Sequence, residues 1–183
     1  MLKLRLKHFS AALALFCVTG FVGCSTAPKS PDVSDAIRHS LDQSGYKDIS
    51  VSQDRDKGVV TLTGHVPAAG DKATAESIAR GLAGGQVVAD EIQVLPPGNE
   101  SAAKDVNADL DDAIKKNLDA VFIQGALHRA VSYDVKNGVV TLTGDVDSQA
   151  RRGEAARMAQ GVPNVVQVVN ELQVKGQKAT SSR

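Results

Sequence analysis

The chain has no tryptophan, only 3% aromatic residues and two cysteines, and its Lys and Arg residues equal its Asp and Glu residues in number. So few aromatic side chains argue against stacking platforms for bases or sugars. The balanced charge argues against electrostatic binding of nucleic acid. The chain also lacks an uninterrupted apolar run of roughly 20 residues, the length that a membrane-spanning helix needs. We therefore expect neither a nucleic-acid partner nor a transmembrane helix.

The N-terminal segment combines a basic start with a short apolar stretch. Lys3, Arg5 and Lys7 precede the run from Phe9 to Val22, a pattern typical of a secretory signal peptide. We expect residues 1–23 to be this signal peptide. Its removal takes away three basic residues and no acidic ones, so the net charge of the mature chain becomes −3.

The cleavage site contains the second cysteine. The tetrapeptide Phe21-Val22-Gly23-Cys24 resembles the bacterial lipobox, and Ser25 resembles the outer-membrane sorting pattern. The resemblance implies that Cys24 is the lipid attachment site of an outer-membrane lipoprotein. Cys17 lies in the leader, so Cys24 would otherwise be an unpaired cysteine in an oxidising compartment. The alternative is cleavage after Ser25-Thr26-Ala27, which would leave a soluble periplasmic protein.

The sequence GVVTLTG occurs twice, at Gly58–Gly64 and at Gly138–Gly144, 80 positions apart. The duplication extends to Glu91–Val94 and Glu171–Val174 at the same offset. Nearer the start of each copy the offset is 77, so we expect three additional residues in the second copy, between positions 119 and 129. A repeat of this length predicts two small domains. We expect an N-terminal tether at 24–32, domains at 33–95 and 106–175, a Pro- and Gly-containing linker at 96–105, and a C-terminal tail at 176–183.

Each copy has the same order of periodicities. Ile37 and Leu41 recur at helical spacing, and the duplicated motif alternates as a half-buried strand does, with Gly64 expected to end it. Asn137-Gly138 is typical of a type I′ hairpin turn. Another strand precedes the motif, and an alanine-rich helix and a last strand, at about 86–94, follow it. The pattern predicts an α+β fold of two tandem α-β-β-α-β domains, each a three-stranded sheet with two helices packed on one face.

The combined motifs resemble the BON domain, a family named for bacterial osmotically inducible periplasmic proteins and nodulation proteins. The resemblance rests on a helix with Ile-x-x-x-Leu, the strand motif G-x-V-x-L-x-G-x-V, and a final G-V-x-x-V that leads to N-x-L-x-V. In this chain these are Ile37 and Leu41, Gly58 to Val66, Ile114 and Leu118, Gly138 to Val146, and Gly161 to Val174. The resemblance implies a non-catalytic periplasmic module that binds phospholipid headgroups or envelope proteins and supports envelope integrity under osmotic stress.

Residues that could perform catalysis or bind a metal are scattered. His39, His65 and His128 lack the spacing of metal ligands, and no nucleophile motif such as G-x-S-x-G is present. We therefore expect a protein that is not an enzyme and that has no metal, cofactor or catalytic residue.

Two surfaces of the second copy are candidates for binding. Its predicted helices carry five basic residues, which we take as candidate contacts to anionic lipid: Lys115, Lys116, Arg151, Arg152 and Arg157. The alternative is an ordinary solvated helix surface. Phe122 and Ile123 lie in an apolar stretch that would suit a chaperone-like or scaffolding protein with protein clients. However, Phe122 continues the i, i+4 stripe of Ile114 and Leu118, which favours a place in the core.

Overall fold

The computed structural model describes residues 28–175, and the structural statements below concern this part of the chain. The expected signal peptide, Cys24 and the expected tail 176–183 lie outside the described residues. The first domain consists of α1 (Ser34–Gln43), β1 (Ile49–Asp54), β2 (Val59–Val66), α2 (Ala69–Leu82), β3 (Val87–Asp90) and β4 (Gln93–Val94). The second consists of α3 (Glu100–Gln124), β5 (Val131–Lys136), β6 (Val139–Val146), α4 (Gln149–Gln160), β7 (Gln167–Asn170) and β8 (Gln173–Val174).

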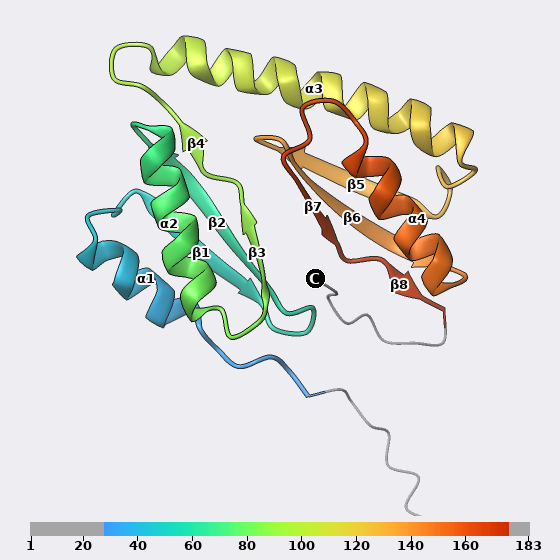
Figure 1. Cartoon of the computed structure of the whole chain (residues 1–183), viewed down its shortest axis with the longest axis horizontal. Coiled ribbons are helices and arrows are strands. Elements are labelled where there is room, and N and C mark those ends of the chain that lie inside the picture. Colours follow the sequence, from blue (N-terminus) through green and yellow to red (C-terminus); the bar gives the residue numbers. More distant parts are fainter. Residues whose placement is uncertain (1–27, 176–183) are drawn as a thin grey trace, which may run out of the picture.

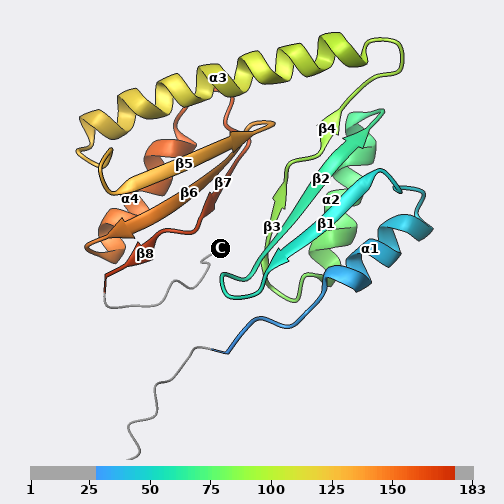
Figure 2. The same cartoon turned by 180° about the vertical axis from the view of Figure 1, so that it is seen from behind.

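Both domains have the same sheet topology, so the predicted α+β fold is confirmed (Figures 1 and 2). In the first sheet the order is β1-β2-β3, with β1 antiparallel and β3 parallel to β2, and β4 also pairs with β2. The second sheet repeats this arrangement with β5, β6, β7 and β8. The expected last strand is therefore split into two short strands. It is interrupted because the Asp90 side chain, rather than the ladder, accepts the Ile92 N–H at 3.1 Å.

Each domain has its own apolar core between its sheet and its two helices. In the first domain the alternating strand residues Val60 and Leu62 face Ile37 and Leu41 of α1. In the second domain their counterparts pack with Ile114, Leu118 and Phe122 of α3. The helical stripe and the strand alternation read from the sequence therefore mark the residues that form the two cores.

The segment expected to link the domains is partly helical. Because α3 begins at Glu100, only residues 96–99 separate it from the end of the first domain. Asp111, on the N-terminal half of α3, accepts the backbone N–H groups of Asn137 and Gly138 at 2.8 and 2.9 Å. This half of the helix thus supports the β5–β6 turn. The expected N-terminal tether is also partly bound to the first domain. The Ser30 N–H donates to the Arg55 carbonyl oxygen at 2.8 Å, and the Arg55 Nε donates to the Ser30 carbonyl oxygen at 2.8 Å.

The two copies differ in length at two places, not one. Ile37 and Ile49 are 12 residues apart, whereas their counterparts Ile114 and Val131 are 17 apart. The second copy is therefore five residues longer before its first strand. It is two residues shorter in the hairpin, because the turn after Lys136 holds only Asn137 and Gly138. Both turn residues have positive φ, 51° and 78°, as the type I′ prediction required.

The second glycine of the duplicated motif does not end its strand, contrary to the sequence expectation. β2 continues through Gly64 to Val66, and β6 continues through Gly144 to Val146. Both glycines have positive φ, 118° at Gly64 and 119° at Gly144. At Gly64 a Cβ atom would overlap the carbonyl oxygen of Asp48, the residue just before β1. Glycine is thus required here by close backbone approach within the sheet.

Candidate functional site

The five basic residues predicted to form one lipid-contacting surface have different environments. Arg152 is only 5% exposed, and burial lowers the pKa of its guanidinium. Its Nη2 donates to the Asn170 carbonyl oxygen at 2.9 Å, while the Asn170 amide donates to the Arg152 carbonyl at 3.1 Å. Including Arg152 in an exposed lipid-binding surface was therefore wrong, since its side chain connects α4 to β7.

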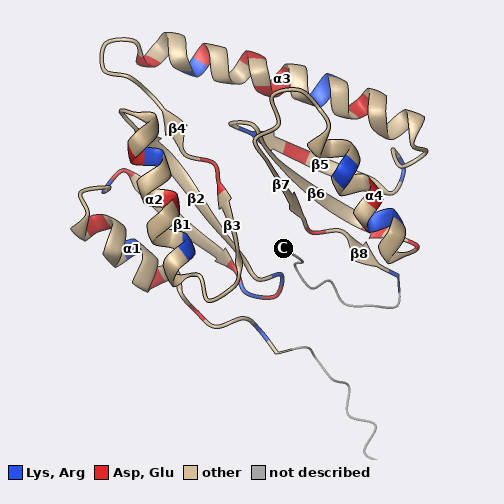
Figure 3. Ribbon diagram, viewed as in Figure 1, with Lys and Arg blue, Asp and Glu red and all other residues tan. Residues whose placement is uncertain are grey.

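The other four basic residues are accessible, but two are already paired with acids. Lys115 lies 3.1 Å from Asp112, and Arg151 lies 3.1 Å from Glu154. Lys116 and Arg157 are exposed. Figure 3 shows basic segments on both α3 and α4, with acidic segments interspersed. Four of the five candidates, Lys115, Lys116, Arg151 and Arg157, therefore remain accessible on α3 and α4, and we call these four the exposed basic surface.

The two apolar residues considered for client binding are separated by the helix geometry. Phe122 is 1% exposed and its ring lies 5.8 Å from that of Tyr133, centroid to centroid. Ile123 is 61% exposed on α3. Phe122 is therefore a core residue, as its stripe indicated, and only Ile123 adds apolar surface.

The domains meet through the sheet faces that their own helices do not cover. A small apolar cluster crosses the boundary and contains Val59 and Ala89 of the first domain and Val139 and Val169 of the second. These are two pairs of equivalent positions, each 80 residues apart in the sequence. The same patch of each domain therefore contacts the other, which is the arrangement of an isologous, twofold interface. Consistently, β3 and β7 run in opposite directions along the boundary (Figure 1).

Polar contacts around this cluster follow the same approximate twofold symmetry. Lys57 Nζ donates to Glu171 Oε2 at 2.6 Å, and this hydrogen bond raises the pKa of Lys57. The equivalent residues are Asn137 and Glu91, and Asn137 Nδ2 donates to the Glu91 carbonyl oxygen at 2.8 Å. Burial raises the pKa of the Glu91 carboxyl. In each domain, the hairpin turn that follows the first strand thus forms a hydrogen bond with the segment that follows the third strand of the other domain.

One contact at the boundary breaks the symmetry. Gln167 Nε2 donates to the Val88 carbonyl oxygen at 2.7 Å, and Gln167 Oε1 accepts the Asp90 N–H at 3.2 Å. The carboxamide therefore covers the outer edge of β3. The residue equivalent to Gln167 in the first domain is Val87, which has no polar side-chain atom to cover the edge of β7.

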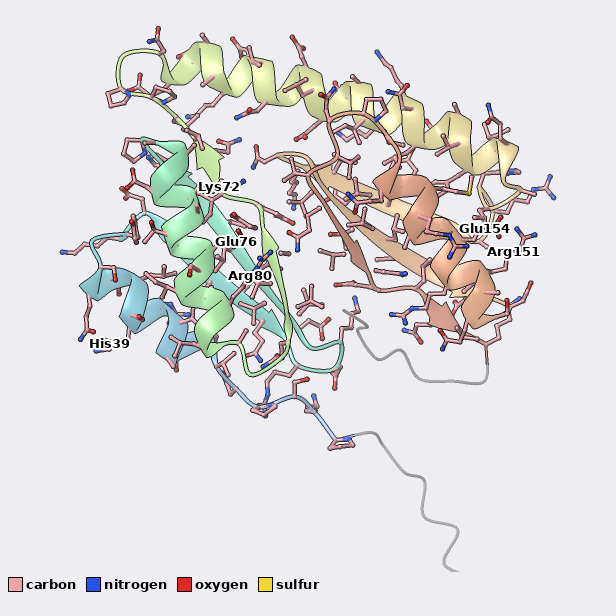
Figure 4. All side chains as sticks on the ribbon, viewed as in Figure 1. His39, Lys72, Glu76, Arg80, Arg151 and Glu154 are labelled. Carbon is pink, nitrogen blue, oxygen red and sulfur yellow. The ribbon has the colours of Figure 1, made fainter. Side chains whose placement is uncertain are left out.

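A groove between α2 and the start of β7 is lined by Lys72, Glu76, Arg80, Asp90, Val166 and Gln167, among other residues. Figure 4 shows Lys72, Glu76 and Arg80 along the side of α2 that faces the second domain. Arg80 pairs with Glu76 at 2.6 Å, and Lys72 Nζ lies 3.8 Å from Asp90 Oδ1 at the base of the groove. Burial raises the pKa of Asp90, and the nearby Lys72 opposes this shift. The groove thus has charged walls with both signs balanced.

Among residues 28–175, no three His, Cys, Asp or Glu side chains converge as metal ligands do. The described part of the chain also contains no helix that is both long enough and apolar enough to cross a membrane. The features of interest are therefore the exposed basic surface and the domain boundary with its groove. Repeat alignment could have indicated the boundary, because Val59 and Val139 are apolar on an otherwise threonine-bearing strand face.

Two domains of one topology, paired through equivalent surfaces, define a tandem-repeat protein. The sequence model of the BON domain matches residues 30–96 and 105–176. The chain therefore belongs to the BON domain family and carries two copies of this domain.

Relatives of this chain include a protein named for its induction. Osmotically-inducible protein Y of Escherichia coli (strain K12) is 33% identical over 137 residues, which cover 74% of this chain and 67% of that protein. Among solved structures, CdsD, a structural protein of the Type III secretion system of Chlamydia trachomatis, aligns at 15% identity and a TM-score of 0.34. The alignment covers 75% of this chain and 90% of that chain. The C-terminal domain of CdsD aligns at 15% identity over 80% of this chain and 99% of that chain, with a TM-score of 0.33.

Proposed function

We propose that this chain is a non-catalytic module of the cell envelope that binds anionic phospholipid headgroups and supports envelope integrity under osmotic stress. Its BON domains and its similarity to an osmotically inducible protein support the role in osmotic stress. We propose the periplasm as its location, with Cys24 as a lipid anchor in the outer membrane. An intact mass of protein extracted from membranes should show diacylglycerol on Cys24. A lipid-free N-terminus at Pro28 would instead indicate a soluble protein.

The observation that carries the lipid proposal is an exposed isoleucine beside exposed cations in the second domain. Lys116 and Ile123 are seven residues apart on α3, about two turns, so they share its outer face. Arg157 is exposed on the neighbouring helix α4. Helices that lie at a membrane surface combine apolar residues that enter the headgroup region with cations that contact anionic lipids. The α3–α4 pair offers this combination on a small scale.

Vesicle flotation of the chain from Pro28 onward tests the proposal without the lipid anchor. Each Lys or Arg near an anionic surface contributes about 1 kcal/mol. The double variant Lys116→Ala, Arg157→Ala should therefore lose about 2 kcal/mol, roughly a 30-fold decrease in binding to anionic vesicles at low salt. High salt should weaken the binding of the unmodified chain, because it screens exposed charges.

A matched control removes the same charge from the first domain. Arg38 and Lys47 are both exposed there, and Arg38→Ala, Lys47→Ala should retain flotation. Equal flotation with anionic and neutral vesicles, or none at low salt with the fold intact, would overturn the lipid proposal. Binding of protein clients would then be the better function for the same module.

A further inference from the structure

The outer edge of β7 presents backbone groups that no side chain or backbone group of residues 28–175 covers. In both parallel strand pairs the alternate residues bond to the central strand, as Glu91 N–H does to Leu62 O and Glu171 N–H to Leu142 O. The residues between them, Val168 and Asn170 in β7, direct their N–H and C=O groups outward. Arg152 covers the Asn170 carbonyl. The Val168 carbonyl and the Val168 and Asn170 amides have no hydrogen-bond partner within residues 28–175.

The same edge of β3 shows what such groups bind. Gln167 donates to the carbonyl of Val88 and accepts from the amide of Asp90, the residues on either side of Ala89. A residue of a parallel strand placed opposite Ala89 would make the same two hydrogen bonds. The Gln167 carboxamide therefore takes the place of the N–H and C=O groups of one residue of an added parallel strand. On β7 the corresponding groups flank Val169, and the corresponding side chain, Val87, supplies no amide.

A hollow lies in front of this uncovered edge. It has a volume of about 450 Å³, and its lining includes Val87, Val88, Gln167, Val168 and Asn170. This volume is within the range of ligand sites in proteins. Its lining combines both strand edges with apolar Val87 and Val88, so it offers backbone hydrogen bonds and contact for small apolar side chains.

We propose that this hollow binds an extended peptide segment, which adds to β7 as a short parallel strand opposite Val169. The partner is a protein with an unpaired extended segment that carries small or β-branched side chains, because the backbone supplies the hydrogen bonds in this mode of recognition. The site is separate from the exposed basic surface on α3 and α4, so it does not depend on lipid binding. It gives the chain a second kind of contact within the envelope.

The approximate twofold symmetry provides a variant that blocks the site from within. Val87→Gln places a carboxamide where it can reach the Val168 carbonyl and the Asn170 amide, as Gln167 does on β3. Val87→Leu is the matched control, because it enlarges the side chain without adding an amide. Both variants leave the two domain cores intact, and urea unfolding verifies that they fold.

The experiment measures fluorescence polarisation of a labelled peptide of alternating threonine and valine with the chain from Pro28 onward. We expect saturable binding that Val87→Gln weakens by about tenfold or more and that Val87→Leu retains. The same peptide with every amide N-methylated should not bind, because it cannot donate to Val168. Absence of binding by the unmodified chain, equal losses in the two Val87 variants, or equal binding of the N-methylated peptide would each overturn the proposal.

A second variant tests the role of Gln167. Gln167→Leu uncovers the edge of β3 and should create a second peptide site, raising the stoichiometry from one peptide per chain to two. An unchanged stoichiometry in a folded Gln167→Leu chain would show that an uncovered strand edge at this boundary is not sufficient for binding, which also contradicts the proposal.

Discussion

Deleting one valine at the domain boundary should destabilise both domains. Val59 is 4% exposed and packs with Val139, which is 2% exposed, in the cluster that joins the two sheets. Val59→Ala removes two methyl groups, each worth roughly 0.8 kcal/mol of burial, and the cavity left behind adds to the cost. We expect a loss of about 2 kcal/mol in the coupling between the domains, which is roughly a 30-fold change in an equilibrium constant.

The two tyrosines allow each domain to be monitored separately. The chain has no tryptophan and two tyrosines, Tyr46 in the first domain and Tyr133 in the second. In a Tyr46→Phe background, Tyr133 fluorescence reports urea unfolding of the second domain alone. Val59→Ala in the first domain should move this Tyr133 transition to lower urea. Val139→Ala, followed through Tyr46 in a Tyr133→Phe background, should have an effect of similar size, because the two valines are equivalent.

A valine within one core serves as the control. Val51 lies in the core of the first domain, and Val51→Ala deletes the same two methyl groups there. It should lower the transition seen by Tyr46 more than the one seen by Tyr133. If Val59→Ala leaves the Tyr133 transition unchanged, the domains are not coupled through this cluster and the twofold interface has no energetic role.

Two further predictions concern single residues of the second domain. Burial and the hydrogen bond that Tyr133 donates to the Asp119 carboxylate raise the pKa of Tyr133 to about 12. The folded pKa lies above the ordinary value of 10. The stabilisation that protonated Tyr133 gives the folded domain is therefore full below pH 10 and is lost as the pH rises toward 12. In a Tyr46→Phe background, a tyrosinate absorbance titration should show late ionisation of Tyr133, and Asp119→Asn should move it to lower pH; no movement would contradict the assigned contact. Gly144 has φ 119° and its Cβ would overlap the Ala130 carbonyl, so Gly144→Ala should cost more than about 2 kcal/mol in urea unfolding. Gly153→Ala, within α4 and clear of other backbone atoms, should stabilise by roughly 0.5–1 kcal/mol, and similar effects at the two glycines would contradict this reasoning.

Periodicity predicted the elements because local sequence and burial agree in this fold. Ile114, Leu118 and Phe122 lie on one stripe of α3 and all face the same core. The Asn137-Gly138 turn was predictable for a similar reason, since the two residues supply the positive φ values that the hairpin needs. Where one residue serves a single local purpose, its type is sufficient to indicate its position.

Other features depend on contacts between segments that are distant in the sequence. Gly64 resembles a strand terminator, and only the approach of the Asp48 carbonyl explains why the strand continues through it. Arg152 resembles a surface cation. Its equivalent in the first copy is Lys72, whose Nζ likewise donates to the carbonyl oxygen of Asp90, the last residue of β3, at 3.3 Å. Alignment of these two pairs within the repeat was a signal that Arg152 is structural.

The domain boundary gives a physical reason for the duplication itself. One BON domain covers one face of its sheet with its two helices and leaves Val59 and Ala89, or Val139 and Val169, on the other face. A domain of this size is close to the lower limit for independent stability, and uncovered apolar residues on a sheet also favour association with other chains. Pairing two copies in one chain covers both patches at once. The two copies differ at positions outside this shared patch. Gln167 and Val87 are such a difference, since the Gln167 carboxamide covers the edge of β3 and the Val87 side chain has no polar atom with which to cover the edge of β7.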